Sequence, residues 1–133
     1  MSRPTVPTEP TGRPVGLIGT GVIGSATIGR LLAAGRQVVV PNRTREHAAA
    51  VLAAGARWAS GADEVVDRCD VVFSGLRNTS AVRAVHGDLV RRVRPGQILA
   101  EHGTFDPGRA AARAGAAERG GALLDAPVTG GRR

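Results

Sequence analysis

Short apolar runs alternate along the chain with longer segments of helical periodicity, beginning at about residue 15. The runs are too short and too uniformly apolar for strands with one face in water, so they predict parallel strands buried on both faces. Because strands and helices alternate, right-handed crossovers and a doubly wound α/β sheet of about six strands are expected. The predicted strands cover residues 15–19, 37–40, 56–58, 70–74, 97–100 and 122–124.

The segments between the runs carry signals for the start and the end of helices. Apolar residues four positions apart, from Ile23 to Leu31, predict a packed first helix, and Gly35 would end it. Ser60 and Asp63 form a Ser-x-x-Asp pair, which predicts the start of a third helix. The other helices are expected between Thr44 and Gly55, over residues 78–90, and from Asp106-Pro107 to Gly120.

The first 14 residues differ in composition from the rest of the chain. They contain four prolines, scattered threonines and no apolar run, which predicts a flexible leader followed by one domain over residues 15–133. This leader has the pattern of neither a signal peptide nor an anchor, and no stretch reaches the roughly 20 apolar residues of a membrane span. A single cysteine, Cys69, allows neither an internal disulfide nor a zinc cluster, so a reducing cytoplasm is the expected location.

Arginine supplies all 18 basic side chains against 11 acidic ones, so the formal net charge is +7 and lysine is absent. Such a basic chain raises nucleic acid as a partner. The densest basic cluster, Arg91, Arg92 and Arg94, is not interleaved with the three aromatic residues, although a single-strand site would need base stacking. A solvated arginine-rich surface is therefore favoured over nucleic-acid binding. The composition also excludes a lysine acid, base or Schiff base from this chain.

A glycine-rich turn, Gly19-Thr20-Gly21-Val22-Ile23-Gly24, follows the first predicted strand and opens the first helix. In that context GxGxxG predicts a Rossmann-type dinucleotide site. Gly19 would permit the tight turn, Gly21 the close approach of backbone to a pyrophosphate, and Gly24 the packing of helix on strand. The amide hydrogens and dipole of the helix start would attract the phosphates.

The turn after the second strand bears on the choice of cofactor. It reads Asn42-Arg43-Thr44 and begins 18 residues after Gly24. A site selective for NAD would have Asp or Glu here to bind the ribose 2′-hydroxyl. Arg43 suits a 2′-phosphate instead, through a charge-assisted hydrogen bond of about 1.5–3 kcal/mol. NADP(H) is therefore favoured, with NAD possible and a merely solvated Arg43 as the alternative.

Further motifs follow the glycine turn in order, and together they resemble the β-hydroxyacid dehydrogenase family. This family includes 3-hydroxyisobutyrate dehydrogenase, tartronate semialdehyde reductase and the cofactor domain of 6-phosphogluconate dehydrogenase. The string Asp125-Ala126-Pro127-Val128-Thr129-Gly130-Gly131 resembles the family's substrate-loop signature, Asp-Ala-Pro-Val-Ser-Gly-Gly. The other matching motifs are Asn42-Arg43-Thr44, Gly55-Ala56, Asp70-Val71-Val72, Pro95-Gly96-Gln97-Ile98 and Thr104-Phe105-Asp106-Pro107.

The resemblance implies an oxidoreductase that transfers a hydride between NADP(H) and a small β-hydroxyacid or its semialdehyde. It also implies a role for each matching residue. Substrate carboxylate or hydroxyl would be held by Thr129, Gly130 and Gly131, and Thr104 would lie near the nicotinamide. The implied cofactor contacts are Gly19, Thr20, Gly21, Val22, Ile23, Gly24, Asn42, Arg43, Thr44, Leu76, Arg77 and Thr104.

The catalytic group that the resemblance implies is a lysine, on a helix beyond Arg133 that leads into an all-helical second domain. We therefore expect this chain to be the cofactor domain alone, with no catalytic residue of its own and without the usual dimer contact, although a homo-oligomer stays possible. A non-catalytic dinucleotide-binding module or a truncated remnant is the alternative, and a related imine reductase is a third interpretation.

Several other polar residues are further candidates. His102, at the end of the fifth strand, could transfer a proton near a nicotinamide, but an incidental histidine is favoured. Glu101 and Asp125 end two strands at the functional edge of the sheet, and Asp125 is expected to order the loop after it. Cys69 is expected to be a packing residue. His47 and His86 are expected on helix surfaces, and no histidines or carboxylates have metal-ligand spacing.

Overall fold

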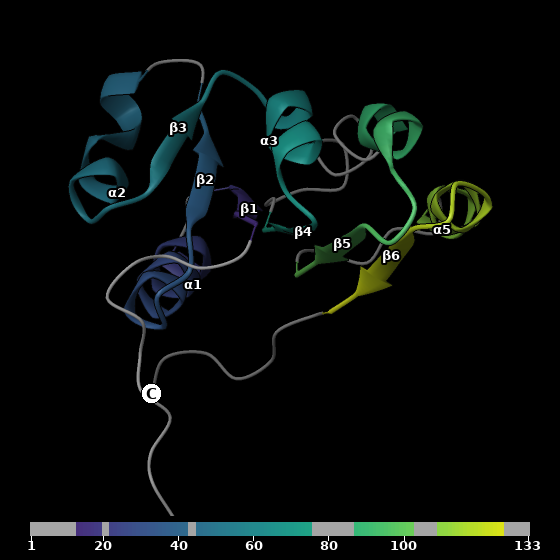
Figure 1. Ribbon diagram of the computed structural model, residues 1–133, viewed down its shortest axis with the longest axis horizontal. Coiled ribbons are helices and arrows are strands. Elements are labelled where there is room, and N and C mark those ends of the chain that lie inside the picture. Colours follow the sequence, from purple (N-terminus) through teal and green to yellow (C-terminus); the bar gives the residue numbers. More distant parts are fainter. Residues whose placement is uncertain (1–12, 20–21, 43–44, 76–86, 103–108, 127–133) are drawn as a thin grey trace, which may run out of the picture.

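A parallel six-stranded sheet is the centre of the computed structural model (Figure 1), which describes residues 13–19, 22–42, 45–75, 87–102 and 109–126. The strand order β3-β2-β1-β4-β5-β6, with every neighbouring pair parallel, confirms the predicted doubly wound α/β fold. The strands are β1 (Val15–Ile18), β2 (Val38–Pro41), β3 (Arg57–Ala59), β4 (Val71–Ser74), β5 (Ile98–Glu101) and β6 (Ala122–Asp125).

Four of the strands, β2, β3, β5 and β6, end one residue later than the apolar runs that predict them. Backbone groups make the hydrogen bonds between strands, so pairing in β5 and β6 continues onto the acidic residues Glu101 and Asp125. Glu101 is thus in register with Ser74 of β4 on one side and Asp125 of β6 on the other. Polar side chains therefore line the carboxyl ends of the strands within the sheet itself.

Helices pack on both sides of the sheet. The first side carries α1 (Val22–Ala33) and α2 (Ala49–Ala53), and the second carries α3 (Ala62–Arg68) and α5 (Arg109–Glu118). Figure 1 shows α1 and α3 on opposite sides of the strands. Two 3-10 helices, η1 (Arg45–Ala48) and η2 (Val90–Arg92), precede α2 and β5. Within the described parts of the chain, no helix is both long and apolar enough to span a membrane.

The predicted helix ends are confirmed at three glycines. Gly35, Gly55 and Gly120 follow α1, α2 and α5 with φ of 79°, 115° and 82°. After α1, the amide of Gly35 donates to Leu32 and the next amide donates to Leu31. The same pair of bonds recurs after the other two helices. This arrangement satisfies the last helical carbonyls and requires a left-handed residue, which glycine adopts without strain.

The predicted start of the third helix is wrong by one position. Gly61, not Ser60, is the N-cap of α3, and a glycine has no side chain to make a capping bond. Ser60 instead donates to Glu64 Oε2 from its backbone amide, at 2.8 Å, and from its hydroxyl, at 3.0 Å. These bonds, the backbone one first, hold the pKa of Glu64 below its usual value. The acceptor for Ser60 is therefore Glu64 and not Asp63, the residue that the Ser-x-x-Asp pattern indicated.

Parts of the predicted pattern lie outside the described residues. The expected leader does so except for Arg13 and Pro14, and the expected helix over residues 78–90 does so except for its last four residues. Thr44 and Asp106, where the second and the last predicted helices were expected to start, also lie outside them. The second helix does not begin as an α-helix, because the 3-10 turn η1 precedes α2.

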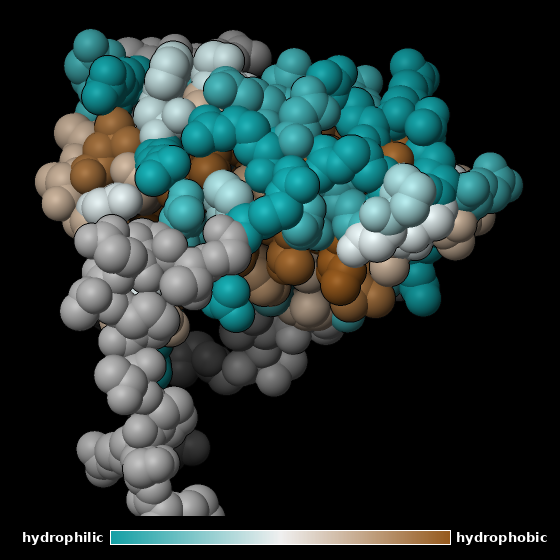
Figure 2. Space-filling view, in the orientation of Figure 1, coloured by the Kyte–Doolittle hydropathy of each residue, from teal (hydrophilic) through white to brown (hydrophobic). Residues whose placement is uncertain are grey.

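The prediction that all strands are buried on both faces is wrong for β5 and β6. Ile98 of β5 and Leu124 of β6 are 36% and 48% exposed. Both lie on the side of the sheet that carries α1 and α2, but those helices pack over β1 and β2 and do not reach this half. We call Ile98, Ala122 and Leu124 the open face. Figure 2 shows apolar residues at the surface in the region of β5 and β6.

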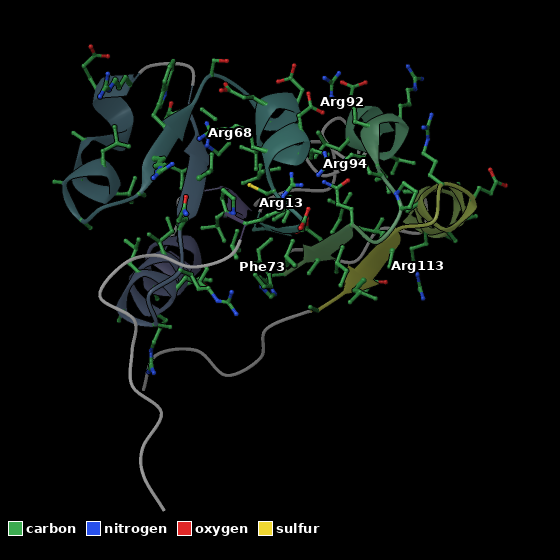
Figure 3. The ribbon with its side chains drawn as sticks, viewed as in Figure 1. Arg13, Arg68, Phe73, Arg92, Arg94 and Arg113 are labelled. Atoms are coloured by element: carbon green, nitrogen blue, oxygen red, sulfur yellow. The ribbon has the colours of Figure 1, made fainter. Side chains whose placement is uncertain are left out.

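Two of the clustered arginines, Arg92 and Arg94, keep part of their side chains exposed and also bind the protein itself (Figure 3). Arg92 donates to both carboxylate oxygens of Asp67, at 3.1 and 2.5 Å, and this contact lowers the pKa of Asp67. Arg94 donates to three backbone carbonyls at the end of α3, at 2.9, 2.9 and 3.2 Å. Buried Gln97 donates to two of the same carbonyls, at 2.6 and 2.8 Å. These side chains satisfy the carboxyl end of α3.

Candidate cofactor and substrate site

The carboxyl ends of all six described strands lie at one edge of the sheet, because every strand is parallel to its neighbours. The chain leaves β1 toward β2, whereas β4, which is reached by a crossover from β3, lies on the other side of β1. Connections therefore diverge between β1 and β4. Ligands of doubly wound sheets bind in the crevice at such a switch point.

The turn after β1 lies against the chain that leaves β4. Gly19 has φ of +99°, and a Cβ atom at this position would lie 3.0 Å from the carbonyl oxygen of Gly75 and 3.1 Å from its carbon. The amide of Gly75 also donates to the carbonyl of Ile18 at 2.9 Å. Two glycine backbones therefore meet at the switch point, where any larger side chain at residue 19 would be excluded.

Gly24 brings the first turn of α1 onto the same backbone. A Cβ atom on Gly24 would overlap the carbonyl oxygen of Gly19 and would also touch Leu17 at 3.5 Å. α1 starts at Val22 and Ile23, and its first turn contains no acidic residue to offset the dipole. The first amides of a helix have no acceptor within that helix, so a helix start without an acidic residue suits an anion such as a pyrophosphate. The backbone cradle formed by Gly19, Gly24 and Gly75 therefore fits a dinucleotide.

The end of β2 is held by a residue that the sequence did not single out. The indole Nε1–H of Trp58, in β3, donates to the carbonyl of Asn42 at 3.0 Å, and the amide of Asn42 donates to Ala59 at 3.1 Å. The turn that would meet the adenosine ribose therefore starts from a position fixed by β3. The signal was present in the sequence, because a partly buried indole needs an acceptor for its N–H.

The ends of β5 and β6 are joined by His102. Its Nδ1 lies 2.7 Å from the carbonyl oxygen of Ala126, and its ring stacks on Phe73 of β4 with centroids 5.3 Å apart. Glu101, one residue earlier, is fully buried. Asp125 forms an ion pair with Arg113 of α5 at 3.5 Å, a contact that the sequence did not indicate.

Two other kinds of site, a reactive cysteine and a metal centre, can be checked among the described residues. Cys69 is fully buried, and burial is the main cause that raises its pKa to about 11. Its thiol is therefore protonated at neutral pH and packs in the core, as predicted. Among the described residues no group of three His, Cys, Asp or Glu side chains could hold a metal ion.

Several predicted site residues are placed by the structure and others are not. Gly19, Val22, Ile23, Gly24 and Asn42 lie at the carboxyl edge, around the β1/β4 switch point and the end of β2. His86 and the remaining candidates lie outside the described residues. Those remaining candidates are Thr20, Gly21, Arg43, Thr44, Leu76, Arg77, Thr104, Thr129, Gly130 and Gly131.

Residues 14–133 match the family described as the NAD binding domain of 6-phosphogluconate dehydrogenase. Cytokine-like nuclear factor N-PAC of Danio rerio is 34% identical over 128 residues, which are 93% of this chain and 28% of that protein. The structure of 3-hydroxyisobutyrate dehydrogenase from Mycobacterium tuberculosis with L-serine matches with a TM-score of 0.79 and 27% identity, over 91% of this chain and 42% of that one. Imine reductase from Myxococcus stipitatus, in complex with NADP+, matches with a TM-score of 0.72 and 25% identity, over 84% and 39%.

The chain spans less than half the length of each of these proteins. The family match covers the glycine cradle and all six described strands, and it confirms the resemblance drawn from the motifs. The chain therefore belongs to the family of NAD(P)-binding domains found in 6-phosphogluconate dehydrogenase and 3-hydroxyisobutyrate dehydrogenase.

Proposed function

We propose that this domain binds NADP(H) across the β1/β4 switch point and serves hydride transfer to or from a small β-hydroxyacid or its semialdehyde. The observation that carries the proposal is the backbone cradle, in which Gly19, Gly24 and Gly75 bring the turn after β1, the start of α1 and the end of β4 together. Packing of α1 on the sheet does not by itself require these glycines to meet at the carboxyl edge, where α1 starts. A pyrophosphate needs this close approach.

The two halves of the sheet have different roles in this proposal. The β1–β3 half holds the adenosine part, with Thr20 and Gly21 at the pyrophosphate and with Asn42, Arg43 and Thr44 at the ribose. The β4–β6 half holds the nicotinamide part, because a dinucleotide spans both halves of a doubly wound sheet. On that side the proposed cofactor contacts are Leu76, Arg77 and Thr104.

The proposed substrate contacts are Thr129, Gly130 and Gly131, in the segment that follows β6. The bound cofactor supplies the redox chemistry by exchanging a hydride at the nicotinamide, and the chain binds and orients it. Oxidation of a CH–OH group also releases a proton from oxygen, which a base must accept. The chain contains no lysine, so a lysine base of the kind implied by the resemblance is not among its residues.

Calorimetric titration with NADPH and with NADH tests the proposal. We expect saturable binding of both, with NADPH tighter. Arg43→Ala should weaken NADPH binding by about tenfold to 150-fold, the equivalent of one charge-assisted hydrogen bond of about 1.5–3 kcal/mol, and should leave NADH nearly unchanged. Gly21→Val should weaken both cofactors, because its side chain would occupy the place of the pyrophosphate.

The matched control is Arg36→Ala. Arg36 is an exposed arginine between α1 and β2, near the amino ends of the strands, so its removal lowers the net charge equally without touching the site. Absence of binding of either nicotinamide would refute the function. Equal losses for both cofactors in Arg43→Ala would refute the role of Arg43 in selectivity.

A second candidate is a non-catalytic dinucleotide-binding module. One observation favours it: a relative of 34% identity is named as a nuclear factor. The two candidates share cofactor binding and differ in turnover. NADPH consumption or formation by the purified chain with 3-hydroxyisobutyrate, tartronate semialdehyde or glyoxylate would exclude the module.

A further inference from the structure

One side chain connects the carboxyl ends of three strands in the half of the sheet assigned to the nicotinamide. His102 directly follows β5, and its backbone amide donates to Ser74, the last residue of β4, at 2.8 Å. Its ring contacts Phe73 of β4 on one side and the carbonyl of Ala126 on the other. Ala126 directly follows β6, and its own amide donates to Glu101 at 2.8 Å.

The bond to Ala126 determines which ring nitrogen carries the hydrogen. A carbonyl oxygen only accepts, so Nδ1 of His102, 2.7 Å away, must be the donor. Nε2 is then the acceptor when the ring is neutral and a second donor when it is protonated. The contact with Ala126 therefore needs only the hydrogen on Nδ1, and it tethers the end of β5 to the end of β6.

The contact with Phe73 fixes the plane of the ring. The two rings are nearly parallel, at 9°, with centroids 5.3 Å apart, which is the offset-stacked geometry that aromatic pairs favour. Phe73 in turn packs into the cluster under α1 that contains Leu31, and it lies on the α1 side of the sheet (Figure 3). Stacking sets the plane of the imidazole and the hydrogen bond sets its rotation within that plane, so neither contact alone would hold the ring.

We propose that His102 is a positioning residue, which fixes the ends of β4, β5 and β6 relative to one another at the nicotinamide and substrate side of the site. This inference rests on the proposed function, which assigns cofactor and substrate contacts to the segments that follow these strands. Each of these ends leads within a few residues to a proposed contact: β4 to Leu76, β5 to Thr104 and β6 to Thr129.

A pair of ligands separates this role from a general structural one. Adenosine 2′,5′-bisphosphate carries only the adenosine half of NADP and would contact the β1–β3 half, whereas NADPH also occupies the β4–β6 half. The dissociation constant of adenosine 2′,5′-bisphosphate divided by that of NADPH therefore measures how much the nicotinamide half contributes to binding. His102→Phe keeps a stacking ring and removes the donor, and it should reduce this ratio about three- to tenfold, the effect of one hydrogen bond. The constant for adenosine 2′,5′-bisphosphate should stay within about twofold.

Further variants distinguish the two contacts. His102→Asn keeps an N–H donor near the position of Nδ1 and should recover part of the ratio, while Phe73→Leu keeps the donor and removes the stack. Leu124→Ala is the matched control, because Leu124 is exposed on β6, on the same face of the sheet, and makes neither contact. Circular dichroism checks that each variant folds, and His102→Asn carries the test if His102→Phe does not.

The outcomes are separable. An unchanged ratio in both His102 variants, or an equal loss in Leu124→Ala, would overturn the positioning role. Binding of neither ligand by the unaltered chain would refute the proposed function instead. In that case a long-range proton–nitrogen spectrum of the His102 ring still tests the tether, since neutral imidazole must carry its hydrogen on Nδ1. A hydrogen on Nε2 would overturn the inference whether or not the cofactor binds.

Discussion

Gly19 allows the backbone cradle to be tested by a single added methyl group. Gly19→Ala has two costs in the folded state. The residue has φ of +99°, and left-handed backbone costs an alanine roughly 1–2 kcal/mol. The new Cβ would also lie 3.0 Å from the carbonyl oxygen and 3.1 Å from the carbonyl carbon of Gly75. Because these are backbone atoms held by the bond to Ile18, relief is difficult, and overpacking of this kind costs about 1–3 kcal/mol.

Gly96 provides the matched control. It has a similar φ of +82°, but a Cβ there would meet no atom within 4 Å, and it lies before β5 at the opposite edge of the sheet from the cradle. Gly96→Ala should therefore lose only the backbone term, partly offset by about 0.4–1 kcal/mol from the restricted unfolded chain. Gly19→Ala should be less stable than Gly96→Ala by about 1–3 kcal/mol.

Urea unfolding followed by circular dichroism measures the difference, and calorimetry measures binding. NADPH binding should be lost in Gly19→Ala and kept in Gly96→Ala, because only the first change displaces the turn at the pyrophosphate. Equal unfolding free energies for the two variants would mean that Gly19 and Gly75 are not in contact. Unchanged NADPH binding in Gly19→Ala would mean that the cradle is not the cofactor site.

Three further changes test other contacts. Gln97→Ala removes two bonds to the end of α3 and leaves a buried gap, so the free energy of unfolding should fall by about 2–4 kcal/mol in urea, with NADPH affinity retained; a neutral change would refute this account of the buried amide. Trp58→Phe removes the donor to Asn42, so NADPH affinity should fall about two- to tenfold by calorimetry, and an unchanged affinity would show that the end of β2 needs no such support. Arg92 lowers the pKa of Asp67, so this pair stabilises the fold above the ordinary carboxyl range and the effect is lost as pH falls through the lowered value. The stability difference between the unaltered chain and Asp67→Asn should accordingly shrink from pH 7 toward pH 3, and a difference that is constant over this range would contradict it.

The sequence predicts those features that depend on local geometry. The strand–turn–helix around Gly19 and the helix ends at Gly35, Gly55 and Gly120 have local signatures, because a left-handed residue is needed there whatever lies around it. Alternation of strands and helices likewise predicts the class of fold. These predictions use only the order of residues and the handedness of the chain.

Features that depend on partners distant in sequence were not predictable. Arg94 and Gln97 bind carbonyls at the end of α3 that are 25 to 31 residues earlier in the chain, and the sequence pattern did not indicate these partners. Trp58 binds Asn42 because β2 and β3 pair in a particular register. Which half of each sheet face is covered also depends on where the helices pack, and no property of Ile98 itself indicates that it is exposed.

The open face affects how the domain should be handled in the laboratory. Ile98 and Leu124 present aliphatic side chains to water in the folded protein, and such patches bind amphiphiles. A dye that fluoresces on apolar surfaces would thus already be bright before any heating, and its thermal melting curve would start from a sloping, elevated baseline. Far-ultraviolet dichroism, or the fluorescence of the single tryptophan, is the sounder reporter of unfolding.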